Sequence, residues 1–71
     1  MAELFPPSLD EQIECVTREI GMRRAVYPGM VTARRMSQEK ADREIAAMEE
    51  VARSLHWLKR QGAKRSQVER I

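Results

Sequence analysis

The chain has 71 residues, enough for one small domain, and 34% of them are charged while only three are aromatic. A chain of this length buries only about 60% of the surface that its unfolded form exposes, so a monomeric core is thin. With only three glycines and three prolines, the composition argues against collagen-like, all-β and loop-rich folds. A single cysteine excludes a disulfide framework and suits a reducing compartment.

The formal net charge of +2 is far from the strongly basic surface of a dedicated nucleic-acid-binding protein. Its distribution is uneven, since residues 1–20 carry a net −4 and residues 59–71 a net +4. No apolar run approaches the roughly 18 residues of a membrane span, and the chain starts without a signal segment. We therefore expect a soluble, cytoplasmic protein that does not contact membranes.

The first expected helix covers about residues 8–35, after an extended lead-in over residues 1–7 in which Pro6-Pro7 disfavours helix. Ser8 and Glu11 form the S-x-x-E pattern of a capping box. Pro28 lacks a backbone donor, so we expect a kink or a break there. The apolar residues fall at alternating spacings of four and three, interrupted only by Arg23, which predicts a narrow seam packed on another helix. They are Leu9, Ile13, Val16, Ile20, Tyr27 and Met30.

The second expected helix covers about residues 38–60, after a turn at Met36 with Ser37 as its N-cap. Gly62 is a natural residue to follow a helix end, which leaves residues 61–71 as a basic tail, either frayed helix or disordered. The apolar positions again recur every three or four residues. They are Ala41, Ile45, Met48, Val51, Ala52, Leu55 and Leu58.

These elements predict an all-α fold, an antiparallel two-helix hairpin over residues 8–60. Two helices cannot enclose a core, because each apolar stripe keeps one side toward water. The usual solution at this size is self-association, so we expect a homodimer that forms a four-helix bundle. The expected dimer core consists of Leu9, Ile13, Val16, Ile20, Ile45, Met48 and Leu55.

Signatures of catalysis are absent: no G-x-S-x-G, P-loop or H-E-x-x-H motif is present, and the chain has one histidine. Cys15 and His56 form a conceivable nucleophile and base, but a seam-edge thiol and a surface histidine are the simpler interpretation. Acidic pairs in the first turns of both helices suit the helix dipole better than a metal. We expect no enzyme activity, cofactor or metal.

Part of the sequence resembles a family of very short phage and prophage proteins with the pattern VYP…M-x-x-x-K-A-x-R-E-I-x-x-M. The matching segments run from Leu9 to Ile13, from Arg24 to Pro28 and from Met36 to Val51, within a similarity over roughly residues 9–58. The resemblance implies a host-takeover protein, since the family includes an anti-activator that binds the quorum-sensing transcription activator of its host. Family members often carry an aromatic residue two positions after the proline, where this chain has Met30.

The leading hypothesis is thus a helical-hairpin inhibitor of a host bacterial regulatory protein, acting by stoichiometric contact. Aromatic residues and arginine most often dominate binding energy at interfaces. The expected partner-binding residues are Tyr27, Met30, Arg34, Arg35 and Trp57. The alternative is a nucleic-acid-binding accessory protein that contacts phosphates through its basic end. The expected phosphate contacts are Lys59, Arg60, Lys64 and Arg65.

Overall fold

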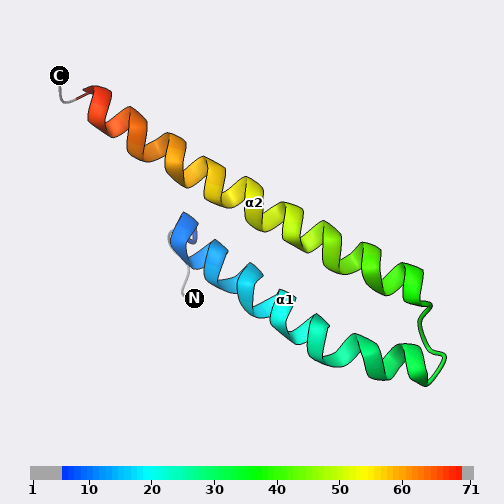
Figure 1. Cartoon of the computed structure of the whole chain (residues 1–71). Coiled ribbons are helices and arrows are strands. Elements are labelled where there is room, and N and C mark those ends of the chain that lie inside the picture. The colour runs from blue at the N-terminus through cyan, green and yellow to red at the C-terminus, as the bar shows by residue number, and fades with distance from the viewer. Residues whose placement is uncertain (1–5, 70–71) are drawn as a thin grey trace.

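The structure, a computed structural model, describes the backbone of residues 6–69 and the side chains of residues 6–62. In this part of the chain the regular elements are two helices, α1 (Leu9–Thr32) and α2 (Gln38–Glu69). They pack against each other in opposite directions in a single layer, joined by a short turn (Figure 1). The all-helical hairpin expected from the sequence is confirmed.

The start of α1 is fixed by the capping box that the sequence predicts. The Glu11 backbone N–H donates to Ser8 Oγ at 3.1 Å, and the Ser8 N–H donates to the Glu11 carboxylate at 2.8 Å. The Gln12 side-chain amide also donates to the Pro7 carbonyl oxygen at 3.1 Å. These bonds satisfy backbone donors that have no partner inside the helix, and they fix where the chain enters α1.

The end of α1 is a Schellman motif, formed at Thr32 rather than near residue 35. The Arg35 N–H donates to the Met30 carbonyl at 2.9 Å, and the Arg34 N–H donates to the Val31 carbonyl at 3.0 Å. Arg34 adopts the left-handed conformation with φ of 62°, a position that glycine usually occupies. This motif turns the chain toward α2.

Of the two outcomes expected at Pro28, a kink or a break, the break is wrong, because α1 runs through this residue from Leu9 to Thr32. Proline removes one backbone donor, but the helix resumes its bonding on the far side, where the Ala33 N–H donates to the Gly29 carbonyl at 2.9 Å. Half-buried Tyr27 and Met30 hold the turns on either side of Pro28 against α2. Tertiary packing thus outweighs the local preference.

The predicted N-cap of α2 is confirmed, since the Lys40 N–H donates to Ser37 Oγ at 3.0 Å. The predicted end near residue 60 is wrong, because α2 continues to Glu69. Gly62 lacks a positive φ and lies inside the helix. A glycine costs a helix interior about 1 kcal/mol relative to alanine, and the flanking residues from Gln61 to Arg65 are mostly good helix formers that outweigh this cost.

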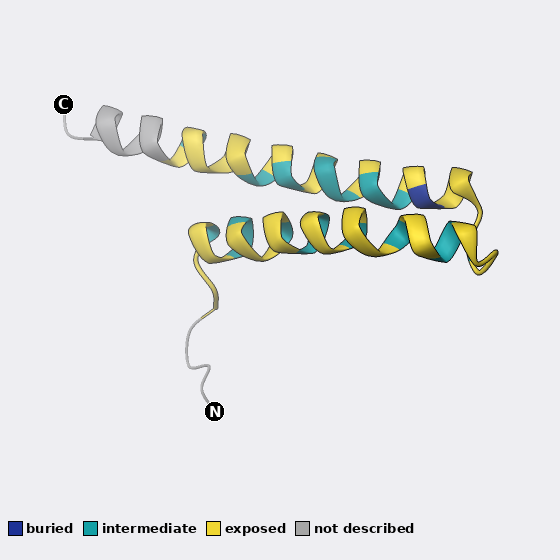
Figure 2. Ribbon diagram, turned by 60° about the horizontal axis from the view of Figure 1, so that its bottom comes forward, coloured by how far each residue is buried: buried dark blue, intermediate teal, exposed yellow. Residues whose placement is uncertain are grey.

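The apolar stripes of α1 and α2 meet in the predicted seam, but the seam is shallow (Figure 2). Among the residues with described side chains only Ala41 is buried, at 2% exposure, and the others of the seam are half-buried. Val51 and Leu58, expected in the seam, are 43% and 47% exposed. Val51 lies about 100° around the helix from the seam residue Ala52, so it lies at the side of the seam.

Arg23, expected to interrupt the seam, is part of it. Its side chain is only 22% exposed and donates to the Glu19 carboxylate at 2.9 Å. It also reaches α2, where it donates to the Glu44 backbone carbonyl at 3.2 Å and carboxylate at 3.3 Å. The hydrogen bond with Glu19 raises the pKa of the Arg23 guanidinium above its ordinary value. Arg23 therefore joins the two helices as a permanent cation.

Glycine at the end of α1 should stabilise the protein. Arg34→Gly removes the penalty of a Cβ in the left-handed conformation and should raise the free energy of unfolding by about 0.5–1 kcal/mol, measured by urea denaturation. Arg35→Gly is the matched control, because Arg35 lacks a positive φ. Equal effects of the two substitutions would contradict the Schellman assignment.

The two neighbouring arginines should differ in their effect on stability. Arg23→Ala removes the half-buried link to Glu44 and should lower the urea midpoint clearly. Arg24→Ala removes only a pair with Glu49 in which Arg24 is 60% exposed, and exposed pairs contribute about 0–1 kcal/mol. Circular dichroism at increasing urea concentration measures both. A larger loss for the Arg24 variant would show that Arg23 does not join the helices.

Candidate protein-binding surfaces

Four of the five predicted partner-binding residues lie at the turn end of the hairpin. Tyr27 and Met30 are half-buried on α1, while Arg34 and Arg35 are exposed in the turn. The Arg23 guanidinium lies over the Tyr27 ring, 5.9 Å from its centroid, which is within the range of a cation–π contact. The Tyr27 ring is therefore partly occupied by contacts within the chain.

The fifth predicted residue, Trp57, lies near the other end of the hairpin. Two cross-helix ion pairs set the register: Arg23 with Glu44, and Lys59 with Asp10 at 2.6 Å. Trp57 follows Glu44 by about 20 Å along α2, and Tyr27 lies about 6 Å beyond Arg23 in the opposite direction. Tyr27 and Trp57 are thus about 25 Å apart along the hairpin, so the structure does not bring the predicted set into one site.

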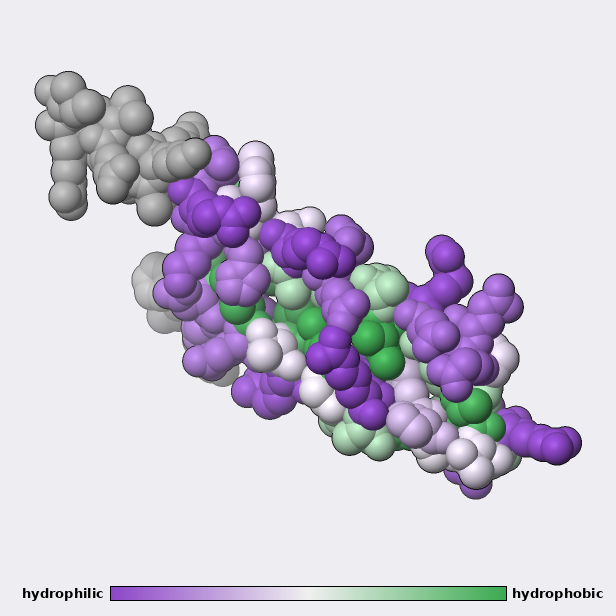
Figure 3. All heavy atoms as spheres, in the orientation of Figure 1, coloured by the Kyte–Doolittle hydropathy of each residue, from purple (hydrophilic) through white to green (hydrophobic). Residues whose placement is uncertain are grey.

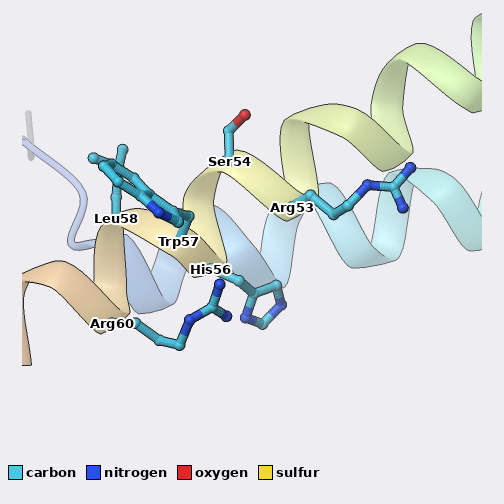
Figure 4. A pocket seen from close by; sticks show the side chains of 6 residues that line it. All are labelled: Arg53, Ser54, His56, Trp57, Leu58 and Arg60. Carbon is cyan, nitrogen blue, oxygen red and sulfur yellow. The ribbon is translucent and has the colours of Figure 1, made fainter.

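Trp57 occupies an apolar surface with a basic rim on the outer side of α2. Trp57 is 53% exposed and its neighbour Leu58 is 47% exposed. Figure 4 shows these two side chains on the same side of α2 as Ser54, with His56 and Arg60 on the other side. The hollow here is lined by Arg53, Ser54, His56, Trp57, Leu58 and Arg60, a set without a carboxylate. We call these six residues the Trp57 surface.

The charge of the Trp57 surface follows from the sequence of α2, since residues 53–62 include three lysines and arginines and no acidic residue. The Arg53 guanidinium also pairs with the Glu50 carboxylate, almost one turn earlier in α2, at 2.6 Å. Lys59 turns toward α1 to pair with Asp10. Arg60 is exposed at the rim. Such a surface suits a partner that presents apolar side chains and carboxylates together.

A second set of exposed apolar residues was not singled out as a binding surface from the sequence. Met22 and Val26 on α1 are 54% and 48% exposed, and Val51 on α2 is 43% exposed. A groove between the helices, lined by Cys15, Val16, Arg18, Glu19, Met22 and Met48, adjoins them. The signal was available: Ala47, Val51, Ser54 and Leu58 form a second stripe with spacings of four, three and four.

The predicted dimer-core residues all lie in the seam between α1 and α2 of a single chain. All seven are half-buried there. On the side shown in Figure 3, apolar surface appears mainly as a band along the line between the helices, with charged side chains on both sides. The seam residues therefore hold the hairpin together, and the exposed apolar residues outside the seam are the ones still available to another molecule.

The predicted phosphate contacts are only partly described. Lys59 is engaged with Asp10, and Arg60 is exposed on the Trp57 surface. Lys64 and Arg65 lie in α2, outside the residues whose side chains the structure describes.

The residues considered for chemistry do not share a site. Cys15 is exposed beside Arg18, whose guanidinium lies 3.4 Å from the Cys15 Sγ atom, and it lines the groove next to Met22. His56 lines the separate hollow of the Trp57 surface. Within the described residues, no three histidine, cysteine or acidic side chains are placed to hold a metal ion. No helix in that same part is long and apolar enough to cross a membrane.

The sequence matches no protein-family model, no curated protein and no solved structure.

Proposed function

We propose that this chain binds a regulatory protein of a bacterial host and inhibits it by stoichiometric contact, without catalysis. The observation that carries this proposal is the half-exposed Trp57 with Leu58 beside it. A tryptophan buries 150–250 Å² when it is covered, so a partner that covers this ring gains far more than one that covers a polar side chain. Tryptophan is also among the residues that most often dominate binding energy at interfaces.

The basic rim supports a protein partner with an acidic margin around an apolar centre. Arg53 and Arg60 flank the exposed indole, and charge complementarity of this kind speeds association and sets orientation. The resemblance to short phage and prophage proteins supplies the class of partner, with a quorum-sensing transcription activator as the leading candidate. In this proposal the protein acts in the cytoplasm of the host cell.

The proposal includes a homodimer in which two hairpins form a four-helix bundle. Its support is the shallow seam, in which only Ala41 is buried among the described side chains. A hairpin of this kind gains little stability alone, and a second layer of helices supplies the missing apolar contacts. A bend of α1 at Pro28 would let its last turns follow the surface of such a bundle.

Substitution of Trp57 should show whether the partner binds at the Trp57 surface or at the turn end of the hairpin. Trp57→Ala should weaken binding of the host activator by about 2 kcal/mol, or roughly 30-fold in Kd, measured by isothermal titration calorimetry. Tyr27→Ala, the matched aromatic substitution at the turn end, should weaken it less. Both variants must retain their helicity by circular dichroism.

Capture from host lysate with mass spectrometry identifies the partner if the activator does not bind. The proposed function fails if no host regulatory protein binds the wild-type chain. The proposed surface fails if a partner binds and Trp57→Ala leaves its Kd unchanged.

The alternative is nucleic-acid binding, favoured by the absence of acidic residues over 53–62. If the basic end contacts phosphates, the logarithm of the association constant for duplex DNA should fall by about 0.9 per contact for each tenfold rise in salt. Deleting residues 62–71, which removes Lys64, Arg65 and Arg70, should then abolish binding. We expect no detectable binding at physiological salt by fluorescence anisotropy. Sub-micromolar binding lost on deletion would favour the alternative.

A further inference from the structure

The two broad faces of the hairpin differ in chemistry. One face carries the groove that joins Cys15 and Met22 of α1 to Met48 of α2. On the opposite face, Arg24 of α1 pairs with Glu49 of α2 across a hollow lined by Thr17, Ile20, Gly21, Arg24, Glu49, Ala52 and Arg53. Successive helix residues are 100° apart, so adjacent Met48 and Glu49 point to the two different faces.

The first of these faces, which we call the neutral face, continues along both helices beyond the groove. On α1, Val26 follows Met22 by one turn, and on α2, Val51 follows Met48 by almost one turn and Leu58 follows Val51 by two. All of its large apolar side chains outside the seam are between 43% and 54% exposed. The neutral face is formed by Cys15, Met22, Val26, Ala47, Val51 and Leu58.

Most of the charged residues that border the neutral face neutralise one another. Arg23 pairs with Glu19 at 2.9 Å and with Glu44 at 3.3 Å, and Lys40 approaches the Glu44 carboxylate at 3.8 Å. These two cations and two anions have no net charge, and Arg18, which lines the groove beside Cys15, adds one cation to the border. A symmetric dimer places the same patch on both sides of its interface, so any net charge would face its own copy. The network of Arg23, Glu19, Glu44 and Lys40 meets this requirement, and Arg18 is a single charge at the edge of the groove.

The chain as a whole exposes more surface than a compact monomer of the same mass. The chain exposes 6101 Å², whereas a compact monomer of its mass exposes about 4500 Å². Two chains in one compact particle would expose about 7500 Å² together, so pairing has up to about 4700 Å² to remove from water. Obligate homodimers bury 2,000–5,000 Å². This total counts the surface of the whole chain, its two ends included, so it is the upper limit of what pairing can bury, and an obligate dimer interface fits within it.

We propose that a second copy of this chain packs on the neutral face. This inference rests on the homodimer of the proposed function and identifies the interface of that dimer. Each helix of a four-helix bundle has two neighbours, and α2 carries two apolar stripes, one in the seam and one through Val51 and Leu58. The bundle encloses the Cys15 thiol. The Arg24–Glu49 face and the Trp57 ring at the rim remain open to a different partner.

A charge substitution with a matched control tests this interface. Val51→Glu puts a carboxylate within the apolar part of the proposed interface on each chain, whereas Ala46→Glu puts the same charge on an exposed position of α2 off the neutral face. Light scattering after size exclusion at about 10 µM should give twice the mass of 8.2 kDa for the wild type and Ala46→Glu. Val51→Glu should weaken the dimer at least 100-fold and give a monomer.

The native Cys15 thiol provides an independent readout, without a substitution at the interface. Its reaction with 5,5′-dithiobis(2-nitrobenzoic acid) should be at least ten-fold slower in the wild-type dimer than in the Val51→Glu monomer. If Val51→Glu loses its helicity by circular dichroism, Met22→Glu replaces it, with Thr17→Glu on the same helix as its control.

A folded wild-type monomer at 10 µM overturns the inference, as does a dimer that survives both neutral-face substitutions or leaves Cys15 equally reactive. These outcomes differ from a failure of the proposed function. If the dimer passes these tests but captures no host protein, the proposed interface stands and the proposed inhibitor function fails. If the protein binds a host regulator but stays monomeric, the proposed function stands and the interface fails.

Discussion

A helix in a two-helix hairpin has a neighbour on one side only, and the rest of this structure depends on that constraint. Among the described side chains, every seam residue except Ala41 keeps part of its surface toward water. Burial of apolar area is the main source of folding free energy, and a single seam supplies little of it. Precise helix ends and cross-helix ion pairs therefore matter more here than in a globular core.

Arg23 shows how the hairpin compensates for its thin seam. Its side chain is only 22% exposed, and its guanidinium bonds Glu19 on its own helix and Glu44 on the other. The exposed pair of Lys59 with Asp10 at the open end agrees with the register in which Arg23 lies opposite Glu44. That register separates Tyr27 from Trp57 and so divides the binding residues expected from the sequence between two ends.

The proposed surfaces divide the exposed apolar residues by the charge around them. The neutral face is bordered by ion pairs that cancel, which suits a second copy of the same chain. The Trp57 surface is bordered by arginine and histidine, which suits an acidic partner. The two surfaces share Leu58 at their boundary. A second copy on the neutral face covers Leu58 and leaves Trp57 on the outer side of α2 open to a different partner.

The sequence by itself determined the local features. Ser8 with Glu11 and Ser37 with Lys40 act through bonds between residues three apart, and the seams follow from helical spacing, so both were predictable. The tertiary structure decided the rest. Pro28 stays within α1 because packing on α2 outweighs its local cost, and Arg23 joins the seam because Glu44 lies opposite. Val51 and Leu58 turned out to lie outside the seam, since which of two adjacent apolar stripes faces α1 depends on the register and rotation of the packed helices.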